Sequence, residues 1–192
     1  MSRAGSATRA RVVQSAKERM RRHGVGATSM LDAIADAGAS RGSLYHYFPG
    51  GKSQLIDEAT AAAAQEYTDA FSLIADLDAE QALPLVVAYW REQVLDSDFE
   101  AGCPVAAAAL GGTECASARA IAGDAFTTWT AIIEQVLTNS GVPADRVPSM
   151  ATLALSAIEG AIVIGLAQRS VEPMERIADE LLELVRLSTR SR

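Results

Sequence analysis

The sequence predicts an all-α fold with a small N-terminal domain over residues 1–52 and a larger helical domain over residues 53–192. Apolar residues recur at the three- and four-residue spacing of helices, and no segment alternates apolar and polar residues as a half-buried strand does. Alanine, the residue that most favours helix, is abundant. At 192 residues the chain can form a hydrophobic core without disulfides or metal sites.

The most informative segment is expected to form two short helices around a tight turn. Ser29 stands three residues before Asp32, which is the spacing of a capping box. Leu31, Ile34 and Ala35 then give the first of these helices an apolar face. Gly38 follows where this helix should end, because glycine adopts the left-handed conformation at little steric cost.

The second short helix has its own start, buried side and end. Ser40 offers an N-cap, Leu44 and Phe48 lie four residues apart on the expected inner side, and Pro49 follows. Because two helices this short are not stable alone, a third must cover them, and a basic helix is expected near residues 8–23. This arrangement is typical of helix-turn-helix proteins that bind DNA.

The outer side of the second short helix has the composition that a major groove requires. A helix needs small residues where it lies closest to DNA and hydrogen-bond donors around them. The residues expected to contact DNA are Thr28, Ser29, Ser40, Arg41, Gly42, Ser43, Tyr45, His46, Tyr47 and Lys52. The alternative is a three-helix packing unit whose outer polar residues are only solvated.

The charge distribution favours DNA binding over that alternative. The chain has a net charge of −7, but residues 1–52 carry +6 and the remaining 140 residues carry −13. A positive N-terminal quarter concentrates attraction for phosphate where the helix-turn-helix lies. Some basic residues of the helix near residues 8–23 are expected only to face solvent.

Composition excludes several other classes. Two cysteines give no disulfide framework, and with only two histidines no metal site and no cofactor are expected. No apolar segment follows the N-terminal arginines, so we expect no secretion signal and a cytoplasmic location. No nucleophile with a neighbouring base and no phosphate-binding glycine loop is visible, which argues against an enzyme.

The middle of the chain is expected to hold helices near residues 53–76, 79–97, 103–111 and 115–139. Its few large aromatic residues and the polar groups beside them could line a site for a small hydrophobic molecule. The candidate lining residues are Tyr67, Phe71, Tyr89, Trp90, Gln93, Cys103, Phe126, Trp129, Thr130 and Ile133. The alternative is that these residues form a solid core, with Cys103 as buried filler. A void of several hundred cubic ångströms would favour a sensor.

The segment 147–168 is apolar on nearly every side and has the length of a membrane span. Glu159 in its middle argues against lipid, because an isolated charge is costly there. This glutamate could pair with Arg169 or Arg119, or face a polar ligand. An all-round apolar helix can instead be buried between two subunits.

A following helix is expected to begin around Pro173. Two such helices from each subunit would make a four-helix interface in a homodimer. The residues expected in this interface are Leu153, Ala157, Ile158, Ala161, Ile162, Ile177, Leu181 and Leu184. We expect no association with membranes.

The N-terminal domain of TetR-type transcriptional regulators resembles the segment SRGSLYHYFPGGK, together with Gly38 and the helix at residues 8–23. The LmrA/YxaF-like branch is similar in the paired glycines of FPGGK, in GCPVAAAALGG at 102–112, and in the stretch from AFTTWTAIIEQVL to IEGAIVIGLAQRSVEP. The resemblance implies a homodimer with a three-helix DNA-binding domain and a larger helical domain for ligand binding and dimerisation. Most relatives are repressors that a small molecule releases from the operator.

These observations together predict a homodimeric repressor that binds a palindromic double-stranded DNA operator and is released by a small hydrophobic effector. Two alternatives remain at this point. One is a helical DNA-binding protein without a ligand sensor, and the other is an enzyme of unknown chemistry.

Overall fold

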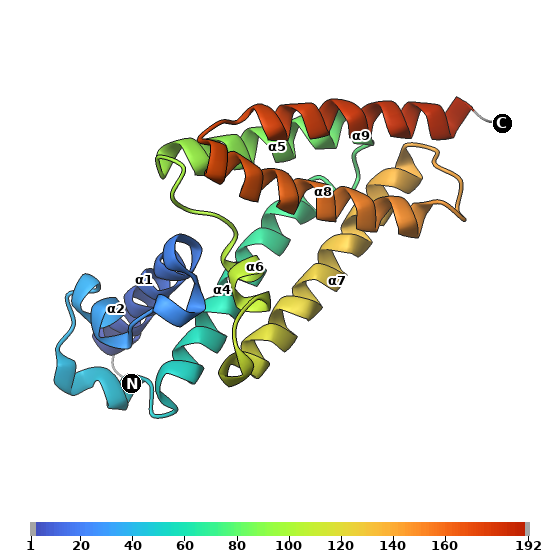
Figure 1. The fold of residues 1–192 in the computed structure, drawn as a ribbon. Coiled ribbons are helices and arrows are strands. Elements are labelled where there is room, and N and C mark those ends of the chain that lie inside the picture. The colour runs from blue at the N-terminus through green and yellow to red at the C-terminus, as the bar shows by residue number, and fades with distance from the viewer. Residues whose placement is uncertain (1–2, 191–192) are drawn as a thin grey trace. The chain divides into compact units, whose positions relative to one another are not determined.

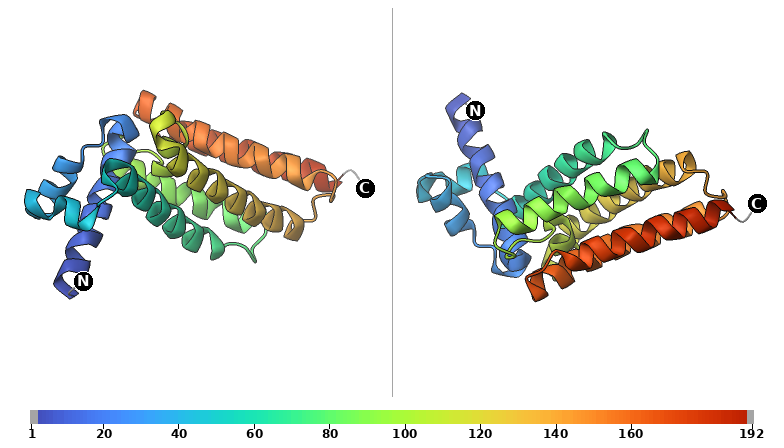
Figure 2. Two further views of the ribbon diagram at one scale, coloured as in Figure 1. Left: turned by 90° about the horizontal axis from the view of Figure 1, so that it is seen from below. Right: turned by 90° about the horizontal axis from the view of Figure 1, so that it is seen from above.

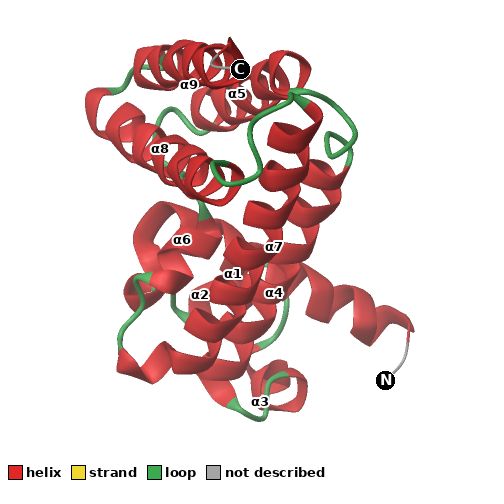
Figure 3. Ribbon diagram, turned by 90° about the vertical axis from the view of Figure 1, so that its right-hand side faces the viewer, coloured by secondary structure: helices red, strands yellow, loops and turns green. Residues whose placement is uncertain are grey.

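The computed structural model describes residues 3–190, apart from the side chains of residues 3–4, 43–44 and 114. Within that part of the chain all regular structure is helical, which confirms the predicted all-α fold (Figure 3). The helices are α1 (Arg3–Ala27), α2 (Met30–Asp36), η1 (Arg41–Ser43), α3 (Leu44–Tyr47), α4 (Gly51–Ser72), α5 (Ala79–Asp96), α6 (Pro104–Ala109), η2 (Thr113–Cys115), α7 (Ala116–Asn139), α8 (Val147–Gln168) and α9 (Glu172–Arg190).

The chain forms two compact units, and helices α4 and α7 each continue from one unit into the other. The first unit extends to Glu66 and resumes over Cys103–Ala125, and the second comprises Tyr67–Gly102 and the chain from Phe126 onward. This division by contacts differs from the expected division after residue 52. The first turns of α4 belong with the N-terminal helices because α1 binds them directly: Arg9 pairs with Glu58, and Lys17 pairs with Glu66.

Helix α1 is the centre of the first unit and packs against both α2 and α6 (Figure 1). Its buried residues Val12, Ala16 and Met20 follow one another at four-residue spacing and are fully shielded from solvent. The helix begins at Arg3, five residues before the expected start at residue 8, and ends at Ala27. It is kinked at Gly24, whose φ is 75°.

Helix α2 has the start and the end that the sequence predicts. The Ser29 side chain accepts a hydrogen bond from the Asp32 backbone N–H, and Gly38 has a φ of 65° after the last turn. The buried residues, however, are Ala33 and Ile34, and the prediction that Leu31 and Ala35 lie on the buried face is wrong, since both are exposed. Leu31 is 46% exposed, because Ala33, Ile34 and Ala37 form the buried side of this short helix.

In the second unit α9 lies alongside both α5 and α8 (Figures 1 and 2). Helix α5 begins with a full capping box between Asp78 and Gln81. The adjacent backbone N–H of Ala79 donates to the Ser140 hydroxyl at 2.8 Å, which ties this start to the end of α7. A core cluster from all four long helices of this unit includes Ala82, Val136, Leu137, Met150, Ala151 and Val185.

Helix α8 is the one helix in the described chain that is long and apolar enough to cross a membrane by length and composition. In the described structure it packs on α9 and α5. The expected partners of its Glu159 bind elsewhere: Arg169 pairs with Asp98 at 2.6 Å, and Arg119 donates to the carbonyl oxygens of Ala109 and Gly111.

Candidate functional site

A hollow on the surface of the first unit gathers residues from α2, η1, α3 and the start of α4. Its lining includes five of the residues expected to contact DNA, namely Thr28, Ser29, Arg41, Tyr45 and Lys52. These positions lie on successive elements of the chain, and the helix-turn-helix brings them together. The hollow therefore lies on the side of the unit that the sequence assigns to DNA.

Most of the expected DNA contacts are exposed to solvent. Tyr45 is 72% exposed, and Ser40, Arg41, Gly42, His46 and Lys52 are also exposed. The Lys52 ammonium donates to the Gly26 carbonyl oxygen at 2.9 Å, which places its charge at the rim of the hollow. The side chain of Ser43 lies outside the described part of the structure.

Two of the expected contacts also take part in packing within the first unit. Thr28 is 1% exposed, and its hydroxyl donates to the Gly24 carbonyl oxygen at 2.9 Å, so this side chain closes the end of α1 and does not reach outward. Tyr47 is half-buried, and its carbonyl oxygen accepts a hydrogen bond from the Arg9 guanidinium at 3.4 Å. Sequence reasoning missed both roles because Thr28 and Tyr47 stand next to exposed residues in the chain.

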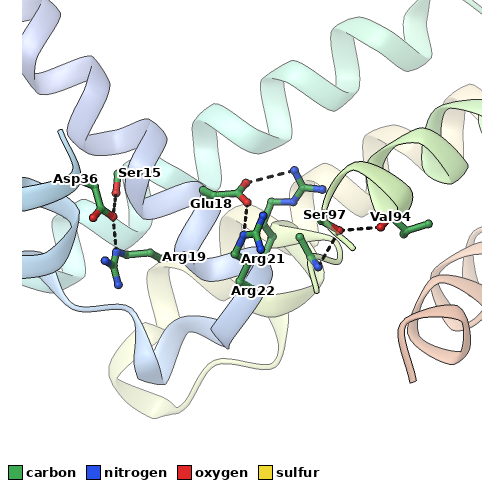
Figure 4. Close-up of polar contacts among 9 residues, drawn as sticks. Ser15, Glu18, Arg19, Arg21, Arg22, Asp36, Val94 and Ser97 are labelled. Atoms are coloured by element: carbon green, nitrogen blue, oxygen red, sulfur yellow. Dashed lines mark hydrogen bonds and ion pairs between the residues drawn. The ribbon is translucent and has the colours of Figure 1, made fainter. Parts of the chain in front are cut away.

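The basic residues of α1 are largely neutralised inside the first unit. Arg19 donates to Asp36 at 2.8 Å, and Arg22 donates to Glu18 at 2.6 Å (Figure 4). Arg19 also donates to Asp32 at 3.3 Å. The hydrogen bond from Arg19, followed by one from Ser15, holds the pKa of Asp36 below its ordinary value. The positive charge of residues 1–52 therefore serves packing as well as attraction for DNA, and Arg41 and Lys52 are the cations placed at the hollow.

A cavity of about 90 Å³ lies in the second unit, surrounded by α5, α7, α8, α9 and the chain at the end of α4. Four of the ten residues expected to bind a ligand line it: Phe71, Trp90, Trp129 and Ile133. The volume is smaller than the several hundred cubic ångströms expected for a sensor. It is also smaller than the roughly 150 Å³ cavity that accommodates benzene in an engineered protein.

Two further aromatic residues, Tyr67 and Tyr89, pack against tryptophans that line the cavity. The buried ring of Tyr67 lies 5.5 Å from the Trp90 ring and 5.9 Å from the Trp129 ring, measured between centroids. Tyr89 packs edge-on against Trp90 at 5.5 Å. The Trp129 indole N–H donates to the Thr68 hydroxyl at 2.9 Å, which fixes that ring. Tyr67 and Tyr89 therefore orient lining residues and do not line the cavity themselves.

The remaining candidate ligand residues lie elsewhere. Phe126 and Thr130 line a shallow depression on the outer side of α7, and Gln93 is half-buried on α5 outside the cavity lining. Cys103 belongs to the first unit, where its sulfur accepts a hydrogen bond from the Ala106 N–H and caps α6. The interpretation of Cys103 as buried structural filler thus fits its position.

The residues expected at a dimer interface divide into three groups. Ile158, Leu181 and Leu184 line the cavity, and Ile177 packs beside it between α5 and α9. Ala161 and Ile162 are buried within the single chain, so they offer no surface to a partner. Leu153 is exposed and Ala157 is half-exposed.

An apolar stripe lies on the outside of α8, and it includes Leu153 of the expected interface residues. Its exposed or half-exposed residues are Thr152, Leu153, Ser156, Gly160, Val163, Ile164 and Ala167. They recur at three- and four-residue spacing and contain no charge, whereas the exposed side of α9 is charged. Because α8 is apolar all round, its periodicity could not separate the outward stripe from the inward one.

Comparison with known proteins matches the N-terminal and the C-terminal part of the chain to protein families. Residues 12–59 match the family described as "Bacterial regulatory proteins, tetR family". Residues 79–180 match that described as "Transcriptional regulator LmrA/YxaF-like, C-terminal domain". An uncharacterized HTH-type transcriptional regulator of Mycobacterium tuberculosis is 37% identical, over 96% of this chain and 98% of its own. YxaF of Bacillus subtilis, also described as an uncharacterized HTH-type transcriptional regulator, is 28% identical over 93% and 95%.

Solved structures show the same fold. The crystal structure of the regulatory protein TetR from Rhodobacter sphaeroides superposes with a TM-score of 0.78 at 19% identity, over 90% of this chain and 95% of its own. The chain has a helix-turn-helix unit and a helical bundle, and its relatives are regulators of transcription. Together these findings define the chain as a DNA-binding regulator of transcription. The chain belongs to the TetR family, in its LmrA/YxaF-like branch.

Proposed function

We propose that this regulator is a homodimeric repressor that binds a near-palindromic operator and leaves it when a small hydrophobic effector enters the second unit. The observation that carries the proposal is the hollow in which Ser29, Arg41, Tyr45 and Lys52 meet on one side of the helix-turn-helix. Donors and cations grouped in this way suit a major groove and its flanking phosphates. A cytoplasmic location is part of the same proposal, because the operator lies there.

A homodimer is supported by the uncharged stripe on α8. Val163 is 62% exposed, and Leu153 and Ile164 are each 48% exposed. Small residues such as Gly160 and Ser156 between them allow a second helix to approach closely. A symmetric interface repeats the same patch on both subunits, so one stripe of this kind is sufficient. The helix-turn-helix units of the two subunits then contact half-sites that lie about one turn of DNA, roughly 34–36 Å, apart.

Effector response is supported by the cavity between the helices of the second unit. Its wall is apolar and aromatic, which is the composition of sites for small organic molecules. Since the cavity holds only about 90 Å³, the effector is small or its entry moves the surrounding helices. A ligand releases DNA only if it prefers the state that does not bind the operator.

The function is tested by selecting duplexes from a random pool with the purified protein. We expect the enriched sequences to be near-palindromes. Arg41→Ala should weaken binding to them by roughly 10- to 100-fold, because it removes a donor at the hollow. Arg146→Ala is the matched control, since Arg146 is exposed in the second unit before α8, and it should leave affinity unchanged.

Failure of the pool to yield any enriched sequence would contradict DNA recognition. A dimer that binds its operator identically with every small molecule in a broad screen would instead favour the alternative without a sensor.

A further inference from the structure

The hollow of the first unit holds apolar side chains as well as the cations described above. Met30 and Leu31 of α2 and Tyr45 of α3 line it together with Arg41 and Lys52. Leu31 is 46% exposed and Tyr45 is 72% exposed, so both side chains offer much of their surface to the occupant of the hollow. The inference that follows rests on the proposed binding of an operator to this hollow, and it concerns which base Leu31 recognises.

Leu31 is not needed to cover the core of the first unit, because Ala33, Ile34 and Ala37 form the buried side of α2. A single exposed leucine is ordinary on a protein surface. This leucine, however, stands beside two further apolar side chains in a hollow whose charged side chains are both cationic. The hollow therefore suits an occupant that combines negative charge with an apolar group.

Duplex DNA offers this combination in its major groove. The phosphates that border the groove are negative and attract cations such as Arg41 and Lys52. The C5-methyl of thymine is the apolar group that base pairs present within the groove. An aliphatic side chain that packs on this methyl favours thymine over the other bases without forming a hydrogen bond. Among the charged and apolar residues of the hollow, Leu31 is the aliphatic side chain with the largest exposed part for such a contact.

We propose that Leu31 is a specificity-determining residue that packs on the C5-methyl of one thymine in each operator half-site. Met30 and Tyr45 border the same contact, and Arg41 and Lys52 supply the attraction for the DNA backbone. The contact adds affinity because apolar surface of the leucine and the methyl is removed from water. Since no phosphate is neutralised by it, the contact should not alter the salt dependence of binding.

The test compares thymine with uracil, which pairs with adenine in the same way but lacks the methyl group. In the duplex that the wild-type protein selects from a random pool, each thymine is replaced in turn by deoxyuridine, in both half-sites together. Fluorescence anisotropy measures the affinity of each duplex. We expect a position at which the replacement weakens wild-type binding by roughly 15-fold, which is about fourfold for each methyl. This comparison needs only the wild-type protein, so it remains decisive even if a variant fails to fold.

Leu31→Ala tests whether this side chain makes the contact. At the sensitive position the variant should bind the thymine and uracil duplexes with equal affinity, close to that of the wild-type protein for the uracil duplex. Its salt dependence should equal that of the wild type. Leu110→Ala is the matched control, because Leu110 is an 87% exposed leucine of the same unit that does not line the hollow, and it should keep the preference for thymine.

The outcomes separate this proposal from the proposed function. A selected operator without thymine, or wild-type binding that tolerates uracil at every position, would overturn the role of Leu31 and leave DNA recognition intact. A preference for thymine that persists in Leu31→Ala would overturn it as well, since another side chain would then contact the methyl. A preference lost in Leu31→Ala and kept in Leu110→Ala would support it. If no duplex is selected at all, the proposed function fails, and the role of Leu31 fails with it.

Discussion

Arg19 on α1 and Asp36 on α2 are joined by a hydrogen-bonded ion pair of 2.8 Å, and this pair holds the last turn of α2 against α1 (Figure 4). The Ser15 hydroxyl donates to the same carboxylate oxygen at 2.9 Å. Arg11 adds a bond to the Ala37 carbonyl oxygen at 3.2 Å. Helix α2 has only seven residues, so its position depends on contacts of this kind as well as on its two buried side chains.

Removing the Asp36 charge should therefore destabilise the protein in a pH-dependent way. Asp36→Asn is expected to lower the free energy of unfolding at neutral pH by about 0.5–1 kcal/mol, since the pair is partly exposed. The pKa of Asp36 lies below the ordinary value of 3.8, so its contribution is complete above that pH and is lost as pH falls through the folded pKa. Urea titrations at neutral and acidic pH measure the difference, which should shrink towards zero in acid.

The control for this experiment is Asp96→Asn, an exposed carboxylate near the end of α5. It should change stability little at either pH. A difference between Asp36→Asn and wild type that grew on acidification would contradict the assigned role of the pair.

The ion pairs of α1 also predict a shallow salt dependence of DNA binding. If only Arg41 and Lys52 of each subunit neutralise phosphates, a dimer makes four such contacts, and the slope of log K against log salt should be about −4. If the nine basic residues of the N-terminal quarter all did so, the slope would be about −16. Fluorescence anisotropy on an operator duplex between low and moderate salt measures it, and a slope steeper than about −10 would show that α1 contacts DNA.

Lys52→Ala should flatten that slope by about 2 per dimer while weakening all sequences alike. The corresponding change at Lys17 makes a useful contrast, because Lys17 is buried against Glu66 and should affect stability and not the slope.

The sequence predicted the helices well because their boundaries depend on local chemistry. The Ser29 cap and the Gly38 stop are decided by a few adjacent residues. The exposed positions of the short helix after the turn followed from the same periodicity, with Tyr45 and His46 outward and Phe48 inward. The family and the helix-turn-helix thus followed from residues near one another in the chain.

What the sequence did not predict depends on contacts between distant segments. The charge of residues 1–52 suggested a cationic surface, but Glu58 and Glu66, which neutralise part of it, lie beyond that segment on α4. Helix α8 is apolar on all sides, so no period could show that Ile158 faces a cavity and Val163 faces solvent. Cys103 was grouped with aromatic residues that belong to a different compact unit.

Two glycines in long helices should respond to alanine in opposite directions. A Cβ at Gly165 of α8 would lie 2.8 Å from the Ser170 carbonyl oxygen, so backbone at the turn into α9 would have to move. Gly165→Ala should therefore lower the free energy of unfolding by about 1–3 kcal/mol. Gly123 of α7 has open space at the same atom, and Gly123→Ala should raise stability by about 0.5–1 kcal/mol through helix propensity.

Thermal and urea denaturation of the two variants side by side measure this contrast. Equal effects of both substitutions would mean that the close approach at Gly165 relaxes at no cost.

The uncharged stripe on α8 predicts how the dimer can be broken. Val163→Arg places a charge in the middle of the stripe, where it would be buried without a partner on association, so the variant should sediment as a monomer. Leu85→Arg is the matched control, because Leu85 is a comparably exposed apolar residue on α5, and it should sediment as the wild type does. Loss of the dimer should also weaken operator binding strongly, because the helix-turn-helix unit of each subunit then binds a half-site alone. A Val163→Arg protein that stays dimeric would place the interface on another surface. A monomer that keeps full operator affinity would show that binding does not require the helix-turn-helix units of two subunits.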